Sequence, residues 1–120
     1  MAQARISKEV RVRTRRFIDL LRRDKFPIQK VIVFGSHAKG AAGWGSDIDI
    51  CVISSKFGHK KGSIDPWDYL WKKRFELKDY ELEPLGFNPR DFIDEDPLVW
   101  EIKKTGKIVY SRHKNSANYQ

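Results

Sequence analysis

The chain has 120 residues, of which 40% are hydrophobic and 33% are charged, and its formal net charge is +8. These values are typical of one soluble globular domain, and no apolar run approaches the ~18 residues of a membrane span. The N-terminus lacks the apolar segment of a signal peptide and the single cysteine, Cys51, excludes an internal disulfide, so we expect a cytoplasmic protein with no membrane partner.

The first element is predicted to be a basic amphipathic helix over residues 8–24, with Ser7 as its N-cap. Its apolar residues recur along one face, with Leu20 beside them: Ile6, Val10, Phe17 and Leu21. Residues 1–30 contain ten Lys or Arg and three Asp or Glu, so they carry +7 of the net charge. Such a surface could bind nucleic acid, an acidic protein or polyphosphate, or could simply be a solvated helix face.

The central stretch, residues 31–54, consists of two apolar runs joined by a glycine-rich turn. We expect a buried strand over 28–34, a short helix over 36–42, a loop over 43–46 and a second strand over 47–53.

Two aspartates, Asp47 and Asp49, are expected on the same side of that second strand, because strand side chains alternate. Two carboxylates this close repel each other unless a cation lies between them, and Mg²⁺ is the usual cation for oxygen ligands beside phosphates. The corner at Gly35 and Ser36 can offer backbone N–H groups to a phosphate at a helix start. The stretch therefore predicts a site that binds a phosphate group next to a metal ion.

The remaining elements alternate between helix and strand. We expect a mobile loop over 54–63, a helix from Asp65 to about Asp79, a strand over 80–85 and a turn at Asn88. Asp96-Pro97 is expected to start a last helix over 98–104, which is followed by a strand over 107–110 and a disordered tail over 111–120. The strand over 80–85 would place Glu81 and Glu83 on one face. We expect a single domain over residues 1–110.

The combination of strand, Gly35–Ser36, helix and, after ten intervening residues, Asp47-Ile48-Asp49 resembles the minimal nucleotidyltransferases of the DNA polymerase beta-like superfamily, whose signature is G-S-x10-D-x-D. Lys39 in Ala-Lys-Gly and Ser46 also match the family pattern. The resemblance covers about residues 5–110. It implies an α/β (α+β) polymerase beta-like fold, with a small mixed β-sheet of about four strands flanked by helices.

The resemblance further implies metal-dependent transfer of a nucleoside monophosphate, AMP from ATP in the first instance, with release of pyrophosphate. Asp47, Asp49 and Glu83 would be the catalytic and metal-binding residues, with two Mg²⁺ ions expected and Mn²⁺ as an alternative. The third carboxylate is commonly Asp in the family. Glu83 is preferred here because it directly precedes Pro84, and Glu81 stays open.

The nucleotide-binding residues implied by the same resemblance are Gly35, Ser36, Lys39 and Ser46, and an exposed helix position is an equally good interpretation of Lys39. Small relatives of this kind often pair with an all-helical HEPN-type protein, and some are antitoxins that AMPylate that partner. The alternatives are a non-catalytic protein that neutralises a partner by contact, a small-molecule (antibiotic-type) nucleotidyltransferase, and a nucleic-acid-binding protein.

Overall fold

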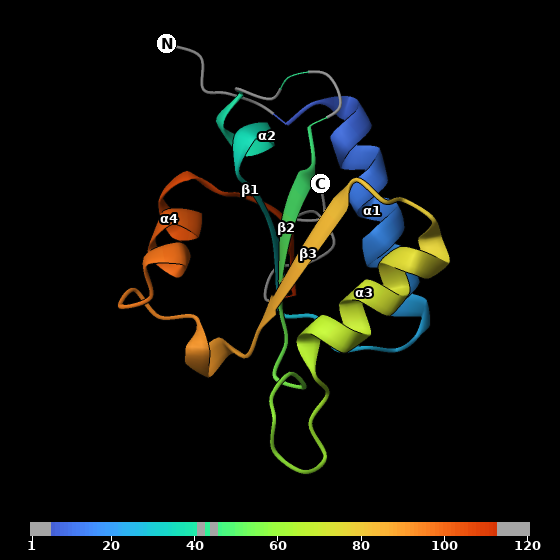
Figure 1. The fold of residues 1–120 in the computed structure, drawn as a ribbon, viewed down its shortest axis with the longest axis vertical. Coiled ribbons are helices and arrows are strands. Elements are labelled where there is room, and N and C mark those ends of the chain that lie inside the picture. The colour runs from blue at the N-terminus through green and yellow to red at the C-terminus, as the bar shows by residue number, and fades with distance from the viewer. Residues whose placement is uncertain (1–5, 41–42, 44–45, 113–120) are drawn as a thin grey trace.

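The fold is a four-stranded mixed sheet with helices on both faces (Figure 1). The computed structural model describes residues 6–40, 43 and 46–112. The helices are α1 (Lys8–Arg23), α2 (Ser36–Lys39), α3 (Pro66–Leu77) and α4 (Pro97–Thr105), and the strands are β1 (Lys30–Phe34), β2 (Ile48–Ile53), β3 (Leu82–Phe87) and β4 (Lys107–Ser111), with a 3-10 turn at Pro89–Asp91. The expected fold class is confirmed. Among the described helices, none has the length and apolar character to cross a membrane.

The strand order is β3-β2-β1-β4. β1 pairs antiparallel with both β2 and β4, whereas β2 and β3 are parallel. Parallel neighbours need a long crossover connection, and α3 forms the helical part of that connection. As a result β2 and β3 begin at the same end of the sheet, close to where β1 ends and α2 begins (Figure 1).

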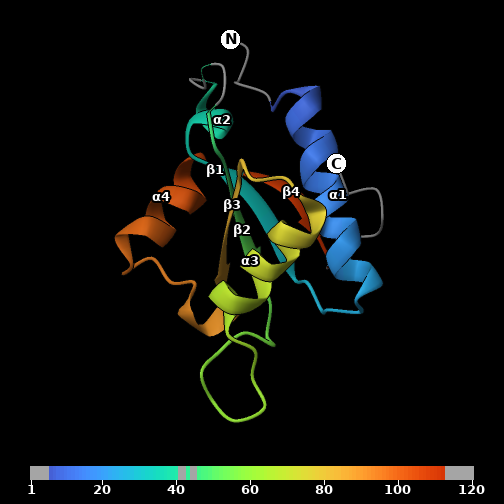
Figure 2. The ribbon, with the colours of Figure 1, turned by 45° about the vertical axis from the view of Figure 1, so that its right-hand side comes forward.

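The helices divide between the two faces of the sheet: α1 and α3 cover one, and α4 lies on the other (Figure 2). The alternation of β2 follows this division. Ile48, Ile50 and Val52 enter the larger core beneath α1 and α3, whereas Cys51 and Ile53 enter a smaller core with Ile102 of α4. Asp49 alternates with Ile48 and Ile50 and therefore belongs to the α4 side.

Three helix starts predicted from the sequence are confirmed by their caps. Ser7 Oγ accepts a hydrogen bond from the Val10 N–H at 3.2 Å. Asp65 accepts one from the Asp68 N–H at 3.0 Å, and Asp96 accepts one from the Leu98 N–H at 2.9 Å. Each side chain satisfies an N–H group that has no partner inside its helix.

Several boundaries differ from the expected ones. β3 runs two residues later than predicted, because α3 ends at Lys78 in a left-handed conformation (φ 61°) and the chain turns before entering the sheet. Glu81 therefore lies outside the strand. Asp47 precedes β2 and is exposed rather than buried within it. β1 begins at Lys30, and α2 ends at Lys39 because Gly40 adopts the left-handed C-cap conformation (φ 74°).

Two core residues were not recognised in the sequence. Ile18 of α1 is fully buried, and Phe57 is 1% exposed although it lies in the segment predicted as a mobile loop. The ring of Phe57 lies 5.0 Å from that of Phe26, so this part of the segment is attached to the core. The expected helix end at 41–42, loop residues 44–45 and tail residues 113–120 lie outside the described residues.

The two sides of α3 should differ sharply in their contribution to stability. Leu70 is fully buried, and Leu70→Ala should lower the free energy of unfolding by about 2–5 kcal/mol. Phe75, on the same helix, is 67% exposed, and Phe75→Ala should change it by no more than about 0.5 kcal/mol. Chemical denaturation of both variants measures the difference, and similar losses would contradict the burial described here.

Candidate active site

The two predicted aspartates and Glu83 meet at the end of the sheet where β2 and β3 begin. Asp49 is paired with Phe34 of β1 on one side and with Glu83 of β3 on the other. Residues directly opposite in neighbouring strands share a face of the sheet, so Asp49 and Glu83 both lie on the α4 side. Asp47 comes just before β2, two residues from Asp49. The parallel register thus brings Glu83 to the pair.

The three carboxylates disfavour one another's charge. Burial raises the pKa of Asp49, the charge of Asp47 raises it further, and His37 opposes the shift. The pKa of Glu83 is also raised, first by burial, then by the charge and hydrogen bonding of Asp47 and by the charge of Asp49, while Arg74 lowers it. Raised pKa values on neighbouring carboxylates indicate negative charge that nearby cations do not fully balance.

This donor set fits a divalent cation by its chemistry, because carboxylate oxygens are the ligands that Mg²⁺ prefers. Within the described part of the chain, however, no three His, Cys, Asp or Glu side chains converge as closely as the ligands of one bound ion. The three carboxylates therefore lie near one another, but their oxygens are not arranged as the ligands of a single bound ion.

The corner at Gly35 lies directly against the Asp49 carboxylate. Gly35 has φ 74° and ψ −153°, a conformation that is essentially restricted to glycine. A Cβ atom there would lie 2.2 Å from Asp49 Oδ2, which is far inside van der Waals contact. At the start of α2, the backbone N–H groups of Ser36 and His37 have no partner inside the helix. The N–H groups at the start of α2 thus lie beside the carboxylate of Asp49.

Two predicted nucleotide-binding residues have other contacts in the structure. Lys39 Nζ forms an ion pair with Glu101 of α4 at 3.0 Å. Ser46 Oγ accepts a hydrogen bond from the Gly43 N–H at 2.9 Å, and the Ser46 carbonyl lies 3.1 Å from His37 Nε2. A role of Lys39 in phosphate binding would therefore require it to leave Glu101.

Glu81, the alternative third carboxylate, is bound by α1 instead. Arg13 forms an ion pair with Glu81 at 2.8 Å and a two-pronged hydrogen bond with Asp79. Hydrogen bonding to Asp79 raises the pKa of Arg13 above its usual range. Because it contacts both residues, Arg13 holds the segment that leads into β3 and so helps to position Glu83. No local sequence signal predicted this contact, which joins residues 66 positions apart.

A pocket of about 330 Å³ opens beside the site. It is lined by the first turns of α1, by His37 of α2 and by Ser46 and Glu81 at the entrances to β2 and β3. Its size is at the lower end of small-molecule pockets. Ser46 connects this pocket to the carboxylates along the chain, because it directly precedes Asp47.

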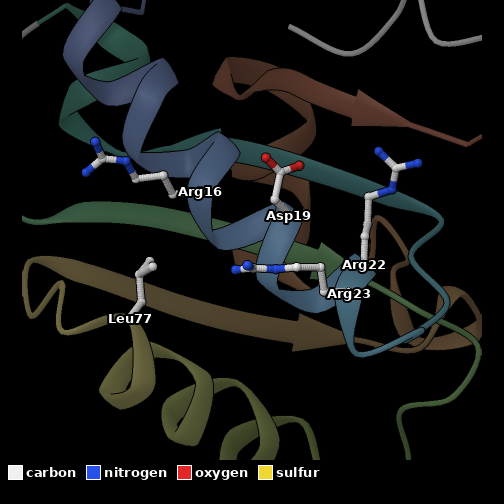
Figure 3. A pocket seen from close by; sticks show the side chains of 5 residues that line it. All are labelled: Arg16, Asp19, Arg22, Arg23 and Leu77. Atoms are coloured by element: carbon white, nitrogen blue, oxygen red, sulfur yellow. The ribbon is translucent and has the colours of Figure 1, made fainter.

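A larger groove of about 660 Å³ lies between α1 and α3, away from the carboxylates. Figure 3 shows Arg16, Asp19, Arg22 and Arg23 extending from α1, with Leu77 opposite them at the end of α3. This groove carries the basic character predicted for the first helix, and its guanidinium groups could bind anions.

Replacing Gly35 should disturb the site through the Asp49 carboxylate. Gly35→Ala combines backbone strain of about 1–3 kcal/mol with the clash at Asp49 Oδ2. Gly62→Ala is the matched control, since Gly62 also has a positive φ (87°) but nothing lies within 4 Å of its would-be Cβ. We expect Gly35→Ala to lower the free energy of unfolding clearly more than Gly62→Ala does, and equal losses would contradict the contact.

Removing the Asp49 charge should stabilise the metal-free protein at neutral pH. The pKa of the Asp49 carboxyl is higher in the folded chain than in the unfolded chain, where it is near 3.8. Folding therefore becomes less favourable as the pH rises from the pKa of the unfolded chain through that of the folded chain. Asp49→Asn removes this effect, so in EDTA its melting temperature should exceed that of the wild type at pH 7, and the difference should shrink towards pH 4. Asp91→Asn, at an exposed turn, is the control. A lower melting temperature for Asp49→Asn would contradict the expected effect.

Comparisons with known proteins identify the family of this chain. The model of the nucleotidyltransferase domain family matches residues 15–113. No curated protein is similar enough to be matched. Among solved structures, a toxin–antitoxin complex with AMP-PNP contains a similar chain, with 21% identity, a TM-score of 0.58 and coverage of 87% of this chain and 76% of that one.

Two further solved structures are similar. One is the tri-AMPylated Shewanella oneidensis HEPN toxin in complex with its MNT antitoxin, with 18% identity, a TM-score of 0.56 and coverage of 90% of this chain and 77% of that one. The other is a putative nucleotidyltransferase from Sulfolobus solfataricus, with 17% identity, a TM-score of 0.55 and coverage of 95% of both chains. At these identities the structures establish the shared fold. With the family model spanning most of its length, the chain belongs to the nucleotidyltransferase domain family.

Proposed function

We propose that this protein is a metal-dependent nucleotidyltransferase that moves AMP from ATP to a side chain of a partner protein, as the antitoxin of a toxin–antitoxin pair. The observation that carries the proposal is the meeting of Asp47, Asp49 and Glu83 beside the Gly35 corner. The neighbouring structures support the choice of nucleotide and partner, because they include an AMP-PNP complex and an AMPylated HEPN toxin. The cytoplasm remains the expected compartment.

In this proposal Asp47, Asp49 and Glu83 are the metal-binding residues. Two Mg²⁺ ions, with Mn²⁺ as an alternative, would neutralise charge on the α-phosphate and align the attacking and leaving oxygens. Binding a cation would also relieve the repulsion that raises the pKa values of Asp49 and Glu83.

The residues of the α2 corner would bind the triphosphate. The N–H groups at the start of α2 and the Ser36 hydroxyl are suitable donors for the β- and γ-phosphates. Gly35 lets these phosphates approach the backbone and the Asp49 carboxylate together, because it has no side chain. Lys39 and Ser46 remain candidates for the same ligand.

Glu83 is the residue that we propose acts on the acceptor. It lies on β3, the edge strand of the sheet, so its outer side is open to an incoming molecule. A carboxylate there can accept the proton of an acceptor hydroxyl as the oxygen attacks phosphorus, and general bases of this kind typically contribute about 10²–10⁴-fold to the rate. We propose Glu83 for this role rather than Glu81, whose carboxylate is paired with Arg13.

The test is transfer of labelled AMP to the purified product of the adjacent gene in the presence of Mg²⁺. The wild type should label the partner, and Asp47→Asn combined with Asp49→Asn should abolish labelling. Glu83→Gln should slow transfer by about 100-fold or more, whereas the matched variant Glu81→Gln should stay within a few-fold of the wild type.

The possible outcomes separate the alternatives. A wild type that does not label the partner, or labelling that survives the double variant, rejects catalysis. A double variant that no longer labels the partner but still neutralises it shows that contact suffices for neutralisation. A stronger effect of Glu81→Gln than of Glu83→Gln would reverse the assignment of the third carboxylate.

A further inference from the structure

Four aromatic side chains and one arginine form a continuous row on the exposed side of α3 and on the segment that follows it. This row is here called the aromatic strip: Trp67, Trp71, Arg74, Phe75 and Tyr80. Three of its members are more than half exposed, with values of 62% for Trp67, 67% for Phe75 and 52% for Tyr80. Large apolar side chains gathered on one surface of a soluble protein mark an interaction site more often than scattered ones do.

The members of the strip are in contact with one another. The rings of Trp67 and Trp71 are stacked at 4.5 Å. The guanidinium of Arg74 lies 4.4 Å from the Trp71 ring centre and 5.5 Å from that of Tyr80, and the Tyr80 and Phe75 rings are 5.9 Å apart. Mutual stacking holds these side chains in place before any partner arrives, which lowers the entropy lost on binding.

The strip leads to the acceptor side of the candidate active site. The Trp71 indole N–H donates a hydrogen bond to the Pro84 carbonyl of β3 at 3.1 Å, and Arg74 donates one to the Tyr80 carbonyl. Pro84 directly follows Glu83, so the hydrogen bond from Trp71 attaches the strip to β3 one residue from that carboxylate. A molecule lying on the strip would therefore reach the open edge of β3 at Glu83.

The charge of this surface favours a protein over a nucleic acid. Residues 66–80 contain four basic residues (Lys72, Lys73, Arg74 and Lys78) and three acidic ones (Asp68, Glu76 and Asp79), a net charge of only +1. Two of the lysines form ion pairs within the same helix, Lys72 with Asp68 and Lys73 with Glu76. Nucleic-acid binding depends on a surplus of positive charge, and on this chain the surplus lies in residues 1–30.

We propose that the aromatic strip is the docking surface for the protein that receives the nucleotide, and that it places the acceptor side chain of that protein at Glu83. The partner surface that fits is an apolar patch with a polar rim, because Trp, Tyr and Arg are the residues that dominate the buried centres of protein interfaces. This inference rests on the proposed function for its choice of partner, and on the contacts of α3 for its location.

The experiment measures binding to the adjacent-gene product by calorimetry, separately from AMP transfer. Trp67→Ala combined with Phe75→Ala should weaken the complex about tenfold or more. The single variant Trp67→Phe keeps a stacking ring and should therefore retain most of the affinity of the wild type. Trp100→Ala is the matched control, since Trp100 is 48% exposed on α4, and it should leave the affinity unchanged. Melting temperatures of all variants verify that they remain folded.

The outcomes are distinguishable from those of the proposed function. Binding that depends on the strip without AMP transfer supports the docking surface and rejects the activity. AMP transfer with unchanged affinity and unchanged KM in the double strip variant overturns the docking surface and leaves the activity intact. The absence of any complex with the wild type also overturns it. A 20-nucleotide single-stranded RNA probe tests the alternative. If the wild type bound this RNA about as tightly as it binds the partner protein, and the double strip variant did not, the surface would belong to nucleic acid and the protein docking would be overturned.

Discussion

The contact between the Gly35 backbone and the Asp49 carboxylate is the constraint on which the site depends. The antiparallel pairing of β1 with β2 places Phe34 opposite Asp49, so the turn that follows β1 closes over the carboxylate. Only a residue without a side chain can occupy that turn, because the required φ is positive and the space is already filled. One backbone geometry therefore brings together the N–H groups proposed to bind phosphate and the carboxylate proposed to bind metal.

The position of Glu83 depends on a second constraint, the parallel pairing of β2 and β3. Since α3 must cross between these strands, the chain reaches β3 through the segment 78–81, and any slip of one residue would turn Glu83 to the opposite face. Arg13 holds this segment through Asp79 and Glu81. An arginine on α1, far from the carboxylates in sequence, thus contributes to the register on which the third carboxylate depends.

Charge is separated over the surface of the protein. The carboxylates gather at one end of the sheet, the arginines of α1 line the groove facing α3, and the outer side of α3 is aromatic and nearly neutral. Burial, and after it the charge of neighbouring carboxylates, raises the pKa values of Asp49 and Glu83, which is a form of electrostatic strain. Such strain is common at functional sites, where the groups needed for the reaction lower the stability of the fold.

The sequence by itself determined the features that are encoded within a few residues: the helix starts at Ser7, Asp65 and Asp96, the alternation of β2 and the Gly-Ser and Asp-x-Asp motif that indicated the family. Only the tertiary structure decided which glutamate joins the aspartates, that Lys39 pairs with Glu101 and that Trp67 and Phe75 of α3 face outward. Caps and strand alternation depend on neighbouring residues, whereas strand register and ion pairs between distant residues depend on how the whole chain packs.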